Sequence, residues 1–316
     1  MRDYADAANI HARIYAMRSR LLSMKDYVSL VRDQKESLYN NNADASEPVE
    51  SEENVFRDQI AKIFPLAEAY RAYTPLFLAF FQQFEALNAK LILAKAFNLQ
   101  SLELWYDIGP YAILNQSLLR EKANLHNIRL LLTGTYLEDV FEDMTSFEQM
   151  ESRVDLCAAR NLYAASALFT RKAKRDFQEL LGRKIAVSAM ILSLRLKKTY
   201  KWDDEKINSF LERFHDAFGG AVRPQIKIVE KALDRHLEQL RASGAQEPSV
   251  VDIDHYLEQY YYNWISSVFH RDFHSISCVV AYLWLLFYQI RNLLRIIEGK
   301  RFGFSPELII GRIVCN

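Results

Sequence analysis

The chain has 316 residues and a mass of 36.9 kDa, with 50% apolar and 25% charged residues, as in an ordinary globular protein. Its 40 basic and 40 acidic residues cancel, so no overall field attracts nucleic acid or an anionic membrane surface. The length is sufficient for a sizeable core divided among two or three domains.

Few residues in the chain interrupt helices. Its 9 Gly and 7 Pro are a low number for this length, and no long segment alternates apolar and polar residues as a strand does. The sequence therefore predicts an all-α fold. Cys157, Cys278 and Cys315 are too few and too scattered for a disulfide framework, and no signal peptide begins the chain, so we expect a cytoplasmic protein.

The N-terminal segment predicts an amphipathic helix. Apolar residues recur at helical spacing from Ile10 to Val31. Basic residues lie on the other faces: Arg13, Arg18 and Arg20. They form either a solvated surface or a face for an acidic partner.

The next segments alternate between loops and helices. Asn40 to Glu53 is polar and acidic and contains Pro48, which predicts a loop. Helical patterns run from Val55 to Leu119, with breaks at Pro65, Pro75 and Gly109-Pro110.

The second half of the chain predicts longer helices. Arg153 to Phe218 is continuously helical in pattern and ends at Gly219-Gly220, the clearest boundary in the chain. Another helix is predicted from Val222 to Ala242, and an aromatic-rich helical segment from Val250 to the C-terminus. The longest apolar run, Ile276 to Ile290, is shorter than the about 20 residues that span a bilayer. We therefore expect a soluble chain without direct membrane insertion.

The stretch from Ser277 to Glu307 has a pattern that recurs in the chain. An apolar run is followed by Asn292, a basic residue at Lys300 and a helix start at Ser305-Pro306-Glu307. The segment from Phe80 to Leu104 has the same pattern.

In that second copy, Asn88 and Lys95 take the places of Asn292 and Lys300. A fainter copy from Phe177 to Ile207 has Ser188, Arg195 and a restart at Asp203-Asp204-Glu205. The spacing of about 100 residues predicts three similar helical domains, at 1–115, 116–220 and 221–316.

Two groups of residues resemble metal sites. His270, His274 and Cys278 would share one face of a single helix, but one straight helix spreads them over two turns, so we interpret the histidines as hydrogen-bonded helix residues. The acidic run Glu138 to Asp143 could chelate Mg²⁺ as in all-helical terpene and prenyl synthases. The second acidic motif of those enzymes is missing, which favours an exposed acidic helix face.

Sequence motifs of catalysis are absent. The chain contains no GxxxxGK[ST], GxGxxG or GxSxG motif, and Cys157 has no neighbouring His. We expect no catalytic residue, cofactor or metal of its own.

Both ends of the chain resemble one known family. His11 to Leu22 (HARIYAMRSRLL) is similar to the opening helix of the C subunit of bacterial and archaeal V/A-type ATPases, called subunit d in eukaryotes. Gln289 to Ile297, Gly299 to Gly303 and Ser305-Pro306-Glu307 are similar to its ending. Asn40 to Glu53 departs from the family pattern.

The resemblance implies a funnel of three helical domains around a pseudo-threefold axis. It implies a rotor connector on the cytoplasmic face of the membrane, between the central shaft subunits and the proteolipid ring that carries H⁺ or Na⁺. Candidate partner-binding residues are the basic ones at the two ends: Arg13, Arg18, Arg20, Arg291, Arg295, Lys300 and Arg301. A terpene synthase-like enzyme and a helical scaffold of another complex are the alternative hypotheses.

Overall fold

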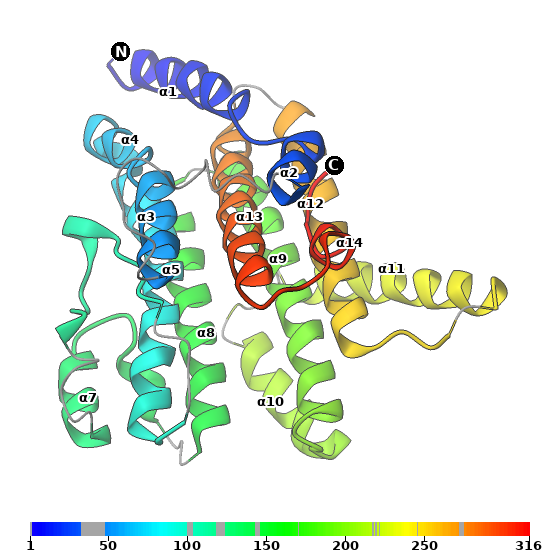
Figure 1. Cartoon of the computed structure of the whole chain (residues 1–316). Coiled ribbons are helices and arrows are strands. Elements are labelled where there is room, and N and C mark those ends of the chain that lie inside the picture. The colour runs from blue at the N-terminus through cyan, green and yellow to red at the C-terminus, as the bar shows by residue number, and fades with distance from the viewer. Residues whose placement is uncertain are drawn as a thin grey trace. The chain divides into compact units, whose positions relative to one another are not determined.

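The chain folds into helices, as the sequence predicts. The structure is a computed structural model, and it describes residues 2–32, 48–99, 104–117, 124–142, 146–169, 171–216, 218, 220, 222–244, 246–271 and 275–316. Within these ranges every regular element is a helix (Figure 1). The all-α fold class is therefore confirmed.

The longer elements are α-helices. They are α1 (Arg2–Arg18), α2 (Met24–Arg32), α3 (Pro48–Ile60), α4 (Phe64–Ala69), α5 (Thr74–Ala96), α7 (Leu125–Leu132), α8 (Phe147–Ala164), α9 (Arg171–Lys198), α10 (Asp204–Asp216), α11 (Arg223–Ala242), α12 (Val250–Arg271), α13 (Ile276–Arg301) and α14 (Pro306–Ile310). Short 3₁₀ helices are η1 (Arg71–Tyr73), η2 (Gly109–Tyr111), η3 (Glu138–Phe141) and η4 (Ala165–Leu168).

The chain divides into two compact units. One unit contains Met1–Ser29, Phe169–Asn292 and Pro306–Asn316, and the other contains Leu30–Leu168 and Leu293–Ser305. The division falls inside α2 and α13. We call the first of these units the α9 unit and the second the α5 unit, after their central helices.

In the α5 unit, α5 is buried along most of its length and packs against α8, α7 and α4. Its first half carries an aromatic cluster, in which Phe84 lies 5.0 Å from Phe56 and 5.6 Å from Phe80, ring centroid to centroid. Its second half joins an aliphatic core that includes Ile92, Leu132 and Val154. The dense aromatic residues of this segment are thus core residues.

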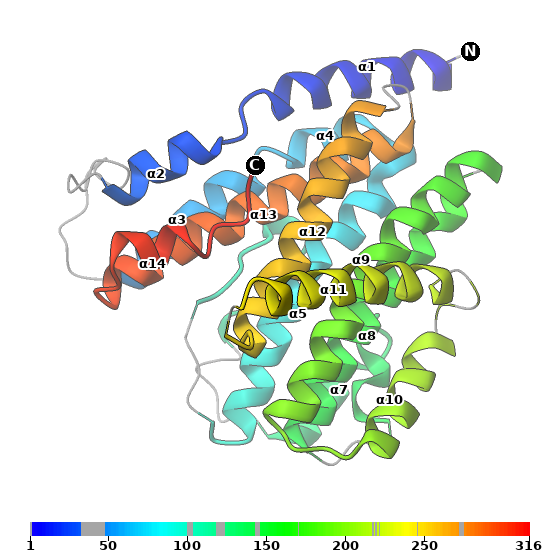
Figure 2. The same ribbon diagram turned by 90° about the vertical axis from the view of Figure 1, so that its right-hand side faces the viewer.

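In the α9 unit, α9 contacts α10, α11 and α12, and Figure 2 shows α11 crossing it. The buried part of α13 contributes large side chains such as Tyr282, Trp284 and Tyr288. Tyr261 of α12 packs edge-on against Trp284, with ring centroids 6.1 Å apart. This unit contains the longest helix of the described chain.

The two asparagines of the recurring pattern make the same interaction in the two units. The Asn88 side chain donates to the Tyr106 carbonyl at 2.8 Å and accepts from the Tyr106 N–H at 2.9 Å. Asn292 likewise donates to the Val314 carbonyl at 2.9 Å and accepts from its N–H at 3.0 Å. Each buried helix thus holds a later segment of the chain by both backbone groups of one residue.

The residue three positions earlier in each helix has a related role. Glu85 accepts from the backbone N–H groups of Ile113 and, at 2.9 Å, Leu114. Gln289 accepts from the N–H of Leu22 at 2.7 Å. These polar side chains satisfy backbone groups of segments that lack a helix or sheet partner. The two helices thus carry polar anchors at equivalent positions, Glu85 and Asn88 in α5 and Gln289 and Asn292 in α13.

The predicted end of the loop from Asn40 to Glu53 is wrong. The predicted loop Asn40 to Glu53 ends earlier, because α3 begins at Pro48, and proline fits the first helical turn. Glu53 accepts from the N–H of Trp105 at 3.2 Å, so this helix is tied to the α5 unit. Residues 40–47 lie outside the described residues.

The predicted continuous helix from Arg153 to Phe218 is interrupted twice. The first break follows α8 and η4, and the second separates α9 from α10. At the second break Lys201 has a φ of 56°, a left-handed conformation that the sequence does not announce because the residue is not glycine. Asp203 then caps α10 by accepting from the Lys206 N–H at 2.7 Å.

Two segments, Arg71–Ala96 and Ile276–Arg301, are long and apolar enough to cross a membrane by length and composition alone. The apolar windows of both are mostly buried within the protein, 72% and 89% respectively, as in core helices of soluble proteins. Their apolar surface is therefore already used in internal packing.

Replacing either asparagine should destabilise the protein. Asn88→Ala or Asn292→Ala leaves a buried N–H and a buried carbonyl without partners, and we expect a loss of about 2–4 kcal/mol in the free energy of unfolding in urea. Asn208→Ala on the exposed side of α10 is the control, with an expected change within about 0.5 kcal/mol. Equal, small effects at all three positions would contradict the role of the two asparagines.

Candidate functional site

The predicted basic residues near the N-terminus lie on α1 and the turn that follows it. Arg13 and Arg20 are exposed, whereas Arg18 is half-buried with its guanidinium 5.9 Å from the Phe269 ring centroid. Tyr15 donates to the Phe269 carbonyl at 3.3 Å, which fixes the helix on the α9 unit. Of the three arginines, Arg13 and Arg20 present charge at the surface.

The predicted basic residues of α13 have contacts inside the protein. Arg291 donates to Glu258 at 3.3 Å, and Arg301 forms a 3.2 Å ion pair with the buried Glu52. Lys300 is exposed and donates to the Leu30 carbonyl at 2.7 Å. Arg295 is half-buried. The structure thus gives several of the seven residues a structural role, and their role in partner binding stays a prediction.

A buried charge network lies among α9, α12 and α13. The Lys184 ammonium is 2.9 and 3.1 Å from the two carboxylate oxygens of Glu258. Tyr288 donates its hydroxyl to the same carboxylate. Arg291 approaches it from the more exposed side. One carboxylate therefore links three helices of the α9 unit.

Aromatic rings surround the lysine of this network. The Lys184 ammonium lies 5.4–5.5 Å from the ring centroids of Tyr261, Trp284 and Tyr288. The electron-rich faces of these rings add to the attraction of the carboxylate. Both partners of the ion pair are thus compensated in a largely buried site.

The charges in the network decide the protonation of its carboxyl group. Burial alone would raise the pKa of Glu258, but the charges of Lys184 and Arg291 and the hydrogen bonds from Tyr288 and Lys184 outweigh burial and lower that pKa to about 2. The carboxylate is therefore charged throughout the physiological range.

The acidic run Glu138 to Asp143 does not form the helical face that we expected. Residues Glu138–Phe141 form the 3₁₀ helix η3, and Asp143 lies outside the described residues. Asp139 pairs with Arg160 at 3.0 Å and Glu142 with Arg153 at 2.8 Å. Arginines of α8 thus neutralise these carboxylates. The alternative function of a Mg²⁺-dependent terpene or prenyl synthase is not supported.

The predicted single helix through His270, His274 and Cys278 is also wrong. His270 belongs to α12, which ends at Arg271, and Cys278 belongs to α13, which begins at Ile276. His274 lies outside the described residues. No group of three or more His, Cys, Asp or Glu side chains in the described ranges is placed to hold a metal ion.

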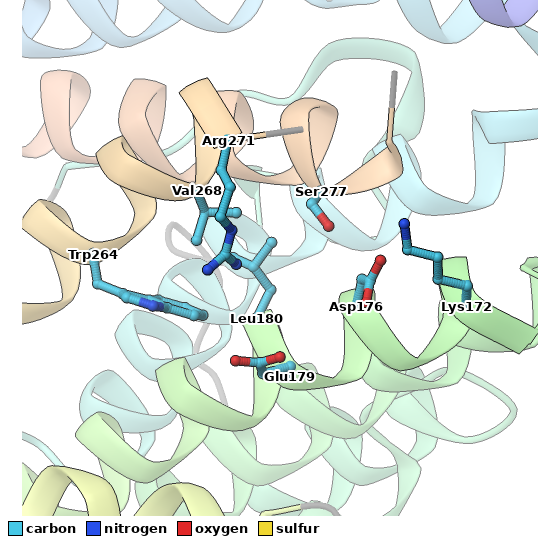
Figure 3. A pocket seen from close by; sticks show the side chains of 8 residues that line it. All are labelled: Lys172, Asp176, Glu179, Leu180, Trp264, Val268, Arg271 and Ser277. Carbon is cyan, nitrogen blue, oxygen red and sulfur yellow. The ribbon is translucent and has the colours of Figure 1, made fainter. Parts of the chain in front are cut away.

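A surface pocket of about 240 Å³ lies between α9, α12 and α13 in the α9 unit (Figure 3). Trp264 lies at one end and Lys172 at the other, with Arg271, Glu179 and Asp176 between them. Arg183 places its guanidinium 3.9 Å from the Trp264 ring centroid. The lining carries charges of both signs.

Sequence reasoning missed the most strongly coupled polar residues, Lys184 and Glu258. A signal was present, since Lys184 begins the apolar stretch KIAVSAMIL and Glu258 stands among aromatic residues in YLEQYYYNW. Charged residues within such stretches need partners. The identity of the partner is not readable, because the two positions are 74 residues apart.

These features define an all-helical protein with large buried helices, in which several charged groups join helices. Comparison with known families agrees with that class. A family model described as "ATP synthase (C/AC39) subunit" matches residues 10–312, nearly the whole chain. The chain belongs to this family of rotary ATPase subunits. Among curated proteins, none matches the chain.

Removing the buried carboxylate should destabilise the α9 unit in a pH-dependent way. The folded-state pKa of Glu258 lies below the ordinary value of about 4.3, so its contribution is complete above that pH and is lost as the pH falls toward about 2. Glu258→Gln should lower the free energy of unfolding by about 3–5 kcal/mol at pH 7, because Lys184 stays buried without its counter-charge.

The same substitution should flatten the fall in stability between about pH 5 and pH 2, measured by urea unfolding. Asp254→Asn, one turn earlier on α12, removes the more exposed ion pair with Arg195 and should cost less than about 1 kcal/mol. Parallel pH curves for the native chain and Glu258→Gln would contradict the assignment.

Proposed function

We propose that this chain is the non-catalytic central-stalk connector of a V/A-type rotary ATPase. It would join the shaft subunits to the membrane proteolipid ring and transmit torque between them. This torque would couple ATP hydrolysis or synthesis to the transport of H⁺ or Na⁺. The observation that carries the proposal is the family match over residues 10–312. The protein would lie on the cytoplasmic face of the membrane, attached through the ring.

The internal contacts of the units suit a part that transmits torque. A connector of this kind must resist shear between its helices. The Lys184–Glu258 ion pair and the paired hydrogen bonds of Asn88 and Asn292 join elements far apart in the sequence. Close packing of large aromatic side chains adds stiffness. These features support a mechanical role.

The three similar domains that we predict would suit a subunit that lies on the rotation axis of the shaft and the ring. Their predicted ranges, 1–115, 116–220 and 221–316, remain part of the proposal. The matching registers of α5 and α13 support two of these copies. Exposed basic residues such as Arg20 would guide docking to an acidic face of the shaft or ring.

The function can be tested in membranes that lack the protein. We expect ATP-driven ion uptake into vesicles to be lost without the chain and restored when it is added back. The purified chain should copurify with the shaft and the ring, and should hydrolyse no ATP by itself. Normal ATP-driven uptake in its absence would refute the proposal.

Charge reversal should reveal the docking role of α1 and its turn. For Arg20→Glu we expect association with the shaft or the ring to be several-fold slower at low salt, with the difference shrinking above about 0.5 M salt. Lys227→Glu makes the same charge change on an exposed position of α11, outside the predicted set, and should have little effect. Identical rates for both variants at every salt concentration would argue against Arg20.

A further inference from the structure

The pocket between α9, α12 and α13 lies within the α9 unit and has a fixed aromatic wall (Figure 3). Trp264 forms this wall, and the Arg183 guanidinium lies 3.9 Å from its ring centroid. Arg183 is itself held by a 2.9 Å hydrogen bond to Gln225, and both of these residues are buried. The position of the ring is therefore set by residues that do not line the pocket.

Two opposite charges line the same pocket without pairing. In the described ranges, the Arg271 guanidinium and the Asp176 carboxylate have no ion-pair or hydrogen-bond partner. Figure 3 shows Leu180 between them. The charge of Glu179, which also lines the pocket, is offset by Arg183 at 3.8 Å. An arginine and a carboxylate within reach of each other usually pair, so their separation leaves space for a ligand that pairs with both.

A buried hydroxyl adds a polar group near Asp176. Ser277 is only 5% exposed, and its hydroxyl points into the pocket (Figure 3). The Ser277 N–H donates to Ser275 Oγ at 3.2 Å, but the hydroxyl has no hydrogen-bond partner in the part of the chain that the structure describes. A hydroxyl buried so deeply normally has a partner. Lys172 lies at the same end of the pocket and has a partner of its own. Asp176 and Ser277 thus offer two acceptors to the N–H groups of a ligand.

We propose that this pocket binds a small zwitterion, whose carboxylate pairs with Arg271 and whose ammonium group donates to Asp176 and Ser277. An apolar stem joins the two charges of the ligand and packs on Leu180 and the Trp264 ring. The cavity of about 240 Å³ is smaller than the pockets of about 300–1,000 Å³ that hold drug-sized molecules, so it suits a ligand of amino-acid size. This inference does not depend on the proposed function.

The test titrates the full chain with three probes of equal stem length, observed by ligand NMR. ε-Aminocaproate carries both charges, caproate carries only the carboxylate, and hexylamine carries only the ammonium group. We expect ε-aminocaproate to bind with a Kd of about 1 mM or tighter. The other two probes should bind at least about tenfold more weakly, because each leaves one charged group of the pocket unpaired.

Two variants locate the ligand and its orientation. Arg271→Gln and Asp176→Asn should each weaken ε-aminocaproate binding at least about tenfold. Arg271→Gln should leave hexylamine binding unchanged, and Asp176→Asn should leave caproate binding unchanged. Arg175→Gln and Asp234→Asn make the same changes at exposed positions outside the pocket lining and should bind ε-aminocaproate like the native chain. All four variants should unfold at the native urea concentration, because the altered side chains lack partners or are exposed.

Three outcomes would overturn the inference. The first is that no probe binds at millimolar concentration. The second is that caproate or hexylamine binds as tightly as ε-aminocaproate, because one end of the pocket would then act alone. The third is native binding by both Arg271→Gln and Asp176→Asn, which would place the ligand elsewhere on the chain. None of these results would bear on the proposed function, which the ion-uptake experiment tests separately.

Discussion

A helix that is buried all round must satisfy every polar group that it carries or covers, and this constraint shapes the protein. In α5 and α13 it is met by one asparagine that pairs with both backbone groups of a later residue. The pairing satisfies polar groups on both sides. The buried side chains of Asn88 and Asn292 have lost their hydration, and the segments that they hold lack the backbone hydrogen bonds of a helix or sheet. The long helices therefore hold the irregular chain as well as forming the core.

The same constraint explains the charged residues inside the α9 unit. Lys184 begins an apolar helix segment and would be costly there alone. Glu258, Tyr288 and a set of aromatic rings compensate it. Such a network ties helices together at fixed orientation, because its geometry tolerates little sliding. Stiffness of this kind would suit the torque-bearing role that we propose.

Left-handed residues end several helices of the described chain. They follow α5 (Asn98), α7 (Gly134), α9 (Lys201), α11 (Gly244) and α13 (Gly303). Two of the five are not glycine, so the conformation of these helix ends is not set by glycine alone. Family membership over residues 10–312 places the chain among rotary ATPase subunits.

The sequence by itself determined the all-α class, the buried long helices, the equivalence of Asn88 with Asn292 and of Lys95 with Lys300, and the family resemblance at both ends. These follow from local periodicity and from spacing along the chain. Only the tertiary structure decided that Arg153 pairs with Glu142 and Arg160 with Asp139, that His270 and Cys278 belong to different helices, and that Lys184 pairs with Glu258. Partners separated by tens of residues are selected by packing, and a non-glycine residue such as Lys201 adopts a left-handed turn only because its surroundings compensate the local strain. Neither effect leaves a local pattern in the sequence.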